Sequence, residues 1–117
     1  MSEHAAKARI VPTPVYVTIT LNPPSGSDKK PTVSVSPPDP VHVSKSKNQE
    51  VVWTSSQNLP FTVIMEPGTP FSGSKFTQSA NHSGVPVLTP DPGAEIYFKY
   101  LVEVEGNIAD PGVFVDA

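Results

Sequence analysis

Fifteen prolines in a chain of 117 residues, together with seven glycines, divide this sequence into short pieces. Proline has no backbone N–H and a fixed φ, so it interrupts helices and central strands alike. The two longest stretches free of both residues are 41–59 and 94–105, and both are rich in valine and aromatic residues. β-Branched and aromatic side chains lose rotamer freedom in a helix and pack well on a pleated sheet. The sequence therefore predicts an all-β protein.

The pieces between the proline and glycine clusters alternate with a period of two, which is typical of half-buried strands. In the clearest run, 95–104, the even-numbered positions are all apolar. Comparable runs cover 15–21, 33–35, 41–43, 50–55, 61–65 and 113–115. We expect a Greek-key β-sandwich of seven or eight strands, with a barrel as the alternative.

The most regular runs also predict the core and two connections. Their inward rows are Trp53, Phe61, Val63, Phe98, Tyr100 and Val102. Residues 56–60 have the length of a hairpin loop, and Gly106-Asn107 looks like the turn of a second hairpin.

The length of the chain predicts one domain, since a domain takes roughly 100–200 residues. Residues 1–12 carry charge and alanine without an alternating apolar row, and we assign them as a flexible N-terminal leader. Residues 13–117 are assigned as a single β-sandwich domain. The first residues place charges where a secretory peptide needs an apolar run, which predicts a cytoplasmic protein. A mature exported protein whose signal has been removed is the alternative.

Charge and cysteine content argue against several classes of protein. Eleven acidic and eight basic side chains give a net charge of −3 with the signs interspersed, unlike a nucleic-acid binder or a polybasic membrane module. The longest apolar run is far shorter than the roughly 18–20 residues of a membrane span. The chain has no cysteine, which excludes disulfides and thiolate zinc sites. We expect neither a nucleic-acid partner nor a membrane partner.

Two parts of the sequence carry a resemblance to a known fold. Residues 49–53, Gln-Glu-Val-Val-Trp, are followed by Phe-Thr-Val at 61–63. Residues 96–101, Ile-Tyr-Phe-Lys-Tyr-Leu, are followed by a loop and by Gly-Val-Phe-Val at 112–115. This order resembles the cupredoxin-like β-sandwich of the small blue-copper proteins, over residues 32–116. It is also similar to small bacterial proteins that end in a Tyr-Lys-Tyr strand and an Asp-Pro-Gly turn. The resemblance implies a cupredoxin-like or immunoglobulin-like sandwich.

The copper ligands of that family are missing from this sequence. A blue-copper site needs two histidines and a cysteine thiolate, usually with a weak methionine. No cysteine lies near Leu101, where the family's cysteine would fall, and no histidine or methionine follows His82. His4, His42 and His82 stand in separate segments, and no spacing joins them. We therefore predict no metal and no cofactor, and a copperless relative of the fold.

Residues 66–93 break the regular alternation and form the candidate functional segment. Loops longer than about 12–15 residues are often functional, and loops on rigid scaffolds often carry binding. We expect a short strand near 75–78 and an extended piece at 85–88. The candidate partner surface on this segment consists of Phe71, Lys75, Phe76 and His82. The alternative is that the two phenylalanines close an open end of the sandwich.

The sequence favours a non-catalytic binding or assembly module, with a protein partner or a second copy of the chain as its ligand. It contains no nucleophile elbow and no phosphate-binding glycine loop. The alternative is a metal-handling or redox-accessory protein that uses the cupredoxin-like fold. A third hypothesis is a hydrolase that uses the carboxylates near the C terminus. These are Glu103, Glu105, Asp110 and Asp116.

Overall fold

Nine strands form the part of the chain that the computed structural model describes, residues 11–26 and 30–117. They are β1 (Thr13–Asn22), β2 (Thr32–Ser36), β3 (Val41–Ser44), β4 (Gln49–Ser55), β5 (Thr62–Met65), β6 (Lys75–Thr77), β7 (Glu95–Val104), β8 (Asn107–Ala109) and β9 (Gly112–Asp116). No helix occurs in these described residues, so the all-β prediction is confirmed. The same residues contain no helix that is long enough and apolar enough to cross a membrane. Most of the predicted leader, residues 1–10, lies outside the described residues.

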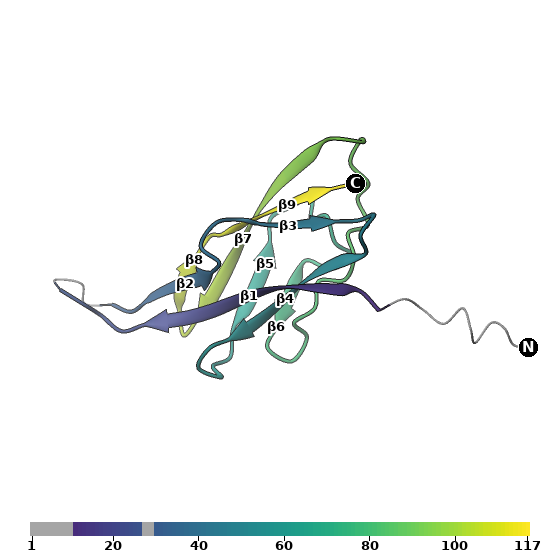
Figure 1. Ribbon diagram of the computed structural model, residues 1–117. Helices are drawn as coiled ribbons and strands as arrows, with labels where there is room; N and C mark the ends of the chain where they lie inside the picture. The colour runs from purple at the N-terminus through teal and green to yellow at the C-terminus, as the bar shows by residue number, and fades with distance from the viewer. Residues whose placement is uncertain (1–10, 27–29) are drawn as a thin grey trace, which may run out of the picture.

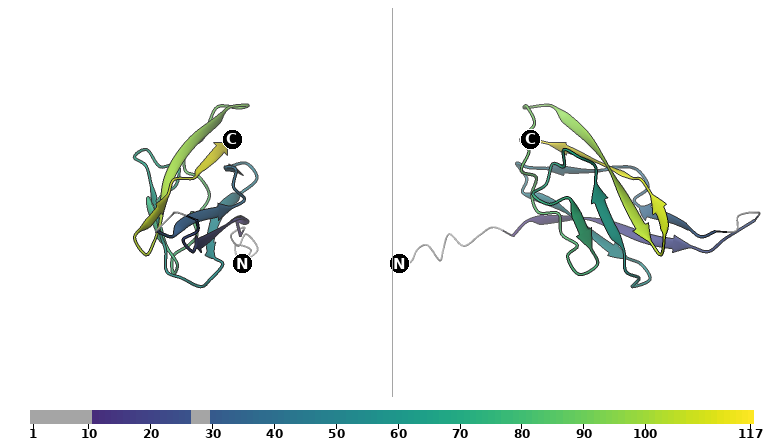
Figure 2. Two further views of the ribbon diagram at one scale, coloured as in Figure 1. Left: turned by 90° about the vertical axis from the view of Figure 1, so that its left-hand side faces the viewer. Right: turned by 180° about the vertical axis from the view of Figure 1, so that it is seen from behind.

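The strands form two sheets that curl around one interior (Figure 1). In the three-stranded sheet, β1 lies at the centre, antiparallel to β2 and parallel to β4. The six-stranded sheet has the order β3-β9-β7-β5-β6, with β8 paired to the end of β7. Strands β3 and β9 are parallel, whereas β7 is antiparallel to both β9 and β5. The left view of Figure 2 shows the sheets as opposing walls of a curled, partly open structure.

Alternation along the strands decides which side chains enter the interior. In β1, for example, Val17 and Ile19 are buried, whereas Thr18 and Thr20 point to the other side and are half-buried. The predicted core rows are confirmed by the burial of Trp53, Phe61, Val63, Tyr100 and Val102, with Phe98 partly buried against them.

The connection from β4 to β5 differs from the sequence prediction. Residues 56–60 have hairpin length, but β4 and β5 belong to different sheets, and the loop passes from one sheet to the other. Gln57 ties this loop to β1, because its Oε1 accepts the Leu21 N–H at 2.9 Å and its Nε2 donates to the Leu21 carbonyl at 2.7 Å. Loop length therefore does not identify the partner strand, since a short loop can also cross between sheets.

The turn near the C terminus lies one residue earlier than predicted. Val104 pairs with Asn107, so Glu105 and Gly106 occupy the two central positions of the turn. Their φ angles are 50° and 83°, and a type I′ hairpin turn requires positive φ at both positions. The short strand that follows, β8, extends the count beyond the seven or eight strands predicted.

A tyrosine hydroxyl and an indole N–H lie inside the core. Burial raises the pKa of Tyr100 to about 12, with a smaller opposing effect of the Trp53 indole N–H. The two rings meet edge to face, with centroids 5.6 Å apart. This contact falls short of hydrogen-bond geometry, so Trp53 Nε1 is buried without a partner.

The raised pKa predicts a loss of stability between pH 10 and 12. In the unfolded chain Tyr100 ionises near pH 10, whereas in the folded protein it stays protonated up to about pH 12. The free energy of unfolding is therefore unaffected by this group below pH 10 and falls as the pH rises from 10 through about 12. The total loss corresponds to about 2–3 kcal/mol, about half of it by pH 11. Urea denaturation at pH 9 and pH 11 measures it. Tyr100→Phe should remove most of the difference and Tyr97→Phe should retain it. Equal losses in the wild type and in Tyr100→Phe would count against burial of this hydroxyl as the cause.

Candidate binding surface

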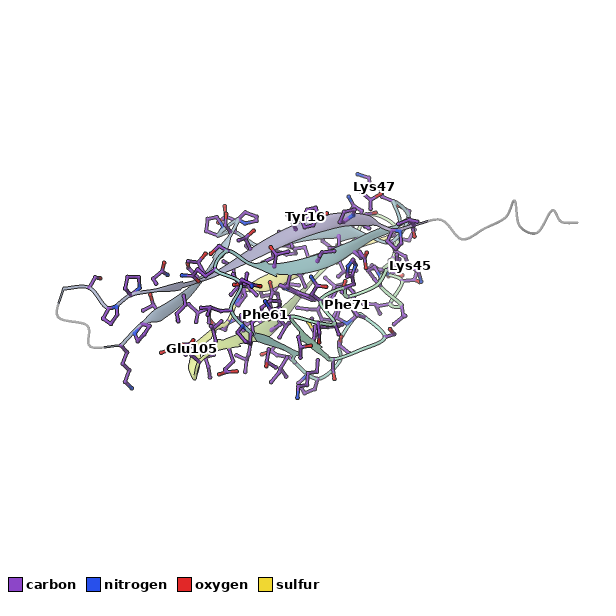
Figure 3. All side chains as sticks on the ribbon, turned by 90° about the horizontal axis from the view of Figure 1, so that it is seen from below. Tyr16, Lys45, Lys47, Phe61, Phe71 and Glu105 are labelled. Carbon is purple, nitrogen blue, oxygen red and sulfur yellow. The ribbon has the colours of Figure 1, made fainter. Side chains whose placement is uncertain are left out.

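The two phenylalanines of the predicted partner surface are core residues. Phe71 is 2% exposed and Phe76 is 6% exposed. Phe76 stacks on Trp53 with ring centroids 5.0 Å apart, and Phe71 meets Phe76 edge to face at 6.5 Å. Figure 3 shows Phe61 and Phe71 within the body of the molecule, surrounded by other side chains. The expectation that Phe71 and Phe76 face a partner is therefore wrong, and the alternative, that they fill the sandwich, agrees with their burial.

Local turn chemistry and strand register direct both rings inward. The Thr69 hydroxyl accepts the Phe71 N–H at 3.2 Å and donates to the Gly73 carbonyl at 3.1 Å, which closes a small loop around Phe71. Strand β6 then pairs with β5 so that Phe76 lies opposite Val63 of the inward row. The burial of Phe76 could not be predicted from alternation, because β6 has three residues and only one of them faces inward. A single inward position forms no repeating pattern.

The two polar members of the predicted surface are exposed but belong to different sheets. Lys75 pairs with Ile64 at the β6 edge of the six-stranded sheet. His82 forms an isolated bridge with Val52 at the edge of β4, in the three-stranded sheet. The segment 66–93 therefore places its predicted binding residues at two separate places.

His82 belongs to a polar cluster that holds the chain against the edge of β4. Its Nδ1 lies 2.9 Å from Oε2 of the buried Glu50, whose Oε1 accepts the Gly84 N–H at 3.1 Å. The Ser83 Oγ accepts the Val51 N–H at 2.8 Å and donates to the Gly84 carbonyl at 2.9 Å. These bonds occupy the serine hydroxyl, so it is not poised as a nucleophile. We interpret the cluster as a structural closure of this sheet edge.

The other histidine of the described chain lies on the six-stranded sheet. His42 Nδ1 is 2.7 Å from Oε2 of Glu95, so each of the two histidines is paired with its own glutamate. In residues 11–26 and 30–117, no group of three or more His, Cys, Asp or Glu side chains could hold a metal ion.

The carboxylates considered for a hydrolase do not converge. Asp116 pairs with Glu95 at the start of β7, whereas Glu103 lies near the other end of that strand. Glu105 lies in the turn, and Figure 3 shows it well separated from Lys45, whose backbone N–H donates to the Asp116 carbonyl at 3.0 Å. The structure therefore assembles no carboxylate pair from this set that includes Asp116.

Apolar side chains are concentrated on the outer side of the six-stranded sheet. Antiparallel sheets with one solvated side normally carry polar residues there. Here the outer positions hold four exposed apolar side chains and one half-buried ring: Ile64 (44% exposed), Tyr97 (45%), Leu101 (40%), Ile108 (61%) and Phe114. We call these five residues the outer apolar face.

Strand register places these side chains in two groups, which Lys99 separates on β7. Tyr97 lies opposite Phe114, and Leu101 lies opposite Ile64. Ile108 lies opposite Glu103, the next outward position of β7 after Leu101. The face therefore runs obliquely over four neighbouring strands, β9, β7, β5 and β8.

A row of rings holds one end of the outer apolar face. His42, Phe114 and Tyr97 lie side by side on three adjacent strands, with neighbouring ring centroids 4.9 and 5.1 Å apart. The Tyr97 ring also lies directly on Gly112, where any side chain would overlap it. Glycine at position 112 therefore leaves room for the Tyr97 ring, which its neighbours hold in place although it is partly exposed. A side chain held in this way loses little rotamer entropy when a partner binds.

One lysine, Lys99, lies within the outer apolar face, and carboxylates beside it balance its charge. Lys99 stands between Tyr97 and Leu101 on β7, and its Nζ is 3.1 Å from Oδ2 of Asp110. The hydrogen bond to Asp110 raises the pKa of Lys99, as do the charges of Asp110, Tyr97 and Glu66, while desolvation acts in the opposite direction. Lys99 is thus protonated, and its charge is balanced by carboxylates beside it.

The sequence contained part of the signal for this surface. The run 95–104 is apolar not only at its inward positions but also at Tyr97 and Leu101, which a fully solvated side would not require. Ile64 and Phe114 could not be added to them from the sequence, because strand pairing places them beside β7.

The fold and this surface define an all-β, two-sheet domain with an exposed apolar sheet face. No family model, curated protein or solved structure matches the chain.

Proposed function

We propose that the protein is a non-catalytic binding module and that it contacts a protein partner through the outer apolar face. The observation that carries this proposal is the exposure of Ile64, Tyr97 and Leu101 on adjacent strands whose opposite side is already packed in the core. Contiguous exposed apolar patches on soluble domains commonly mark interaction sites. Removing apolar surface from water contributes about 25 cal/mol of favourable free energy for each Å² that is buried.

The proposed scaffold is a copperless, cupredoxin-like Greek-key sandwich. The first stretch that carries the resemblance corresponds to β4 and β5, and the second corresponds to β7 and β9. In support, β7 and β9 are direct neighbours in one sheet, while β4 and β5 lie in opposite sheets. The chain has no cysteine for a blue-copper centre. In the part of the chain that the structure describes, no group of three or more His, Cys, Asp or Glu side chains supports the metal-handling alternative.

The position of the face on the sheet suits it to binding. Strand β7 is paired over its whole length, with β9 at residues 95–99, with β5 at 100–103 and with β8 at 102–104. Side chains on such a strand are held on a rigid backbone, so less conformational entropy is lost when a partner orders them.

Simultaneous replacement of Ile64 and Leu101 by serine should abolish most binding and leave the fold intact. A random 12-residue peptide library, displayed on phage and selected on the wild-type protein, supplies the probes. Selected peptides should bind the double variant about tenfold more weakly or worse, because central apolar contacts each contribute more than about 1 kcal/mol. The free energy of unfolding should change by about 1 kcal/mol or less, since both side chains are partly exposed.

The matched control is Tyr16→Ser combined with Val87→Ser, which removes two exposed apolar side chains from other parts of the structure. This control should keep the affinity of the wild type. Undiminished binding by the Ile64→Ser, Leu101→Ser protein, measured by fluorescence polarisation, would refute the proposed face.

A further inference from the structure

The charges around the outer apolar face are predominantly negative. Five carboxylates and three lysines lie on or beside the outer positions of β5, β6, β7 and β9. The carboxylates are Glu66, Glu95, Glu103, Asp110 and Asp116, and the lysines are Lys47, Lys75 and Lys99. Lys47 lines the same hollow as Glu95 and Asp116, and His42 is paired with Glu95. The face is therefore an apolar strip inside an acidic rim.

The acidic groups are distributed over both ends of the strip. Glu95 and Asp116 are cross-strand partners at the start of β7, beyond the row of rings. Glu103 lies near the other end of β7, and Asp110 is bonded to Lys99 between the two ends. Lys99 and Asp110 balance one another, so neither adds to the net charge of the rim. The remaining charges are four carboxylates and two lysines: Glu66, Glu95, Glu103, Asp116, Lys47 and Lys75.

This distribution disfavours a second copy of the chain as the occupant. If two outer apolar faces packed on each other, two rims with an excess of carboxylates over lysines would be brought together. Like charges juxtaposed in an interface oppose association. A nucleic acid is disfavoured for the same reason, because its phosphate backbone is polyanionic.

We infer that the occupant is a protein segment that presents apolar side chains flanked by lysine or arginine. Its apolar residues would cover Tyr97, Leu101 and Ile64, and its cations would pair with the carboxylates of the rim. Complementary charge of this kind accelerates encounter and excludes wrong partners. This inference rests on the proposed function, since it names the chemistry of the partner for the same face.

Three synthetic peptides of one design test the inference. Each has twelve residues and repeats Leu-X-Phe-Ser, where X is lysine, glutamine or glutamate, so that only the charge differs. Fluorescence polarisation is measured at about 50 mM and 500 mM NaCl, a range over which the screening length falls severalfold. The lysine peptide should bind the wild type at least about tenfold more tightly than the glutamate peptide at low salt, and the difference should shrink at high salt.

Two double variants assign the effect to the rim. Glu66→Gln with Glu103→Gln should weaken the lysine peptide about fivefold and leave the glutamine peptide unchanged. Glutamine keeps a side-chain oxygen for the N–H of Gly106, which Glu103 accepts. Asp39→Asn with Asp91→Asn makes the same change in net charge in loops outside the strands, and should have little effect.

The outcomes separate the inference from the proposed function. If the glutamine or glutamate peptide binds as tightly as the lysine peptide or more tightly, the basic partner is refuted. If that binding is lost in the Ile64→Ser, Leu101→Ser protein, the outer apolar face is still supported as the binding surface. If none of the three peptides binds at about 1 mM, both the basic partner and the outer apolar face are refuted. The same conclusion follows if the peptides bind the Ile64→Ser, Leu101→Ser protein as tightly as they bind the wild type. Dimerisation of the wild type through this face, seen by sedimentation and lost in the serine variant, overturns the basic partner in favour of a second copy.

Discussion

Replacement of Phe71 by alanine should lower the free energy of unfolding by about 3–5 kcal/mol, although this residue lies in a long irregular segment. The ring is 2% exposed and packs edge to face on Phe76, so its removal leaves a cavity among core side chains. Such a loss is a large share of the roughly 5–15 kcal/mol that stabilises a small domain. Urea denaturation followed by far-ultraviolet circular dichroism measures it.

Val87 provides a control in the same segment. Its side chain is exposed, and its backbone N–H donates to the Pro70 carbonyl at 2.8 Å, a bond that alanine keeps. Val87→Ala should therefore change the free energy of unfolding by about 0.5 kcal/mol or less. A Phe71→Ala protein as stable as this control would show that the ring does not contribute to the core.

Replacement of Trp53 by alanine should be equally damaging, with a loss of about 3–5 kcal/mol. Trp53 is fully buried on β4, stacks on Phe76 and meets Tyr100 edge to face. It is the only tryptophan in the chain, so circular dichroism must replace intrinsic tryptophan fluorescence as the probe. An unchanged urea midpoint would contradict its place at the centre of the core.

Trp53→Phe separates the two contributions of this side chain. The indole N–H is buried without a hydrogen-bond partner, and burying such a donor costs about 1–3 kcal/mol. Phenylalanine keeps most of the ring contact and removes the unpartnered donor. We therefore expect Trp53→Phe to cost less than half as much as Trp53→Ala, and equal costs would contradict a stabilising contribution of the ring contact that phenylalanine retains.

The proposed binding surface could be predicted only in part. The sequence predicts a partner surface in the irregular segment 66–93, because Phe71 and Phe76 stand outside any alternating row. Burial of both rings shows why this inference failed: a long segment can fold back and supply core side chains through turns of its own. Conversely, Tyr97 and Leu101 occupy regular strand positions, where exposed apolar residues attract little notice one at a time.

Local sequence patterns specify that the protein is all-β, where most strands lie, and which side of β1, β5 and β7 is buried. Proline placement and period-two alternation settle these features, because both act through neighbouring residues and can be read in any short window. Only the tertiary structure decided that β4 and β5 lie in different sheets, and that Ile64 and Phe114 join Tyr97 and Leu101 in one face. Those arrangements depend on packing between residues far apart in the chain, and no local pattern specifies which strands will become neighbours.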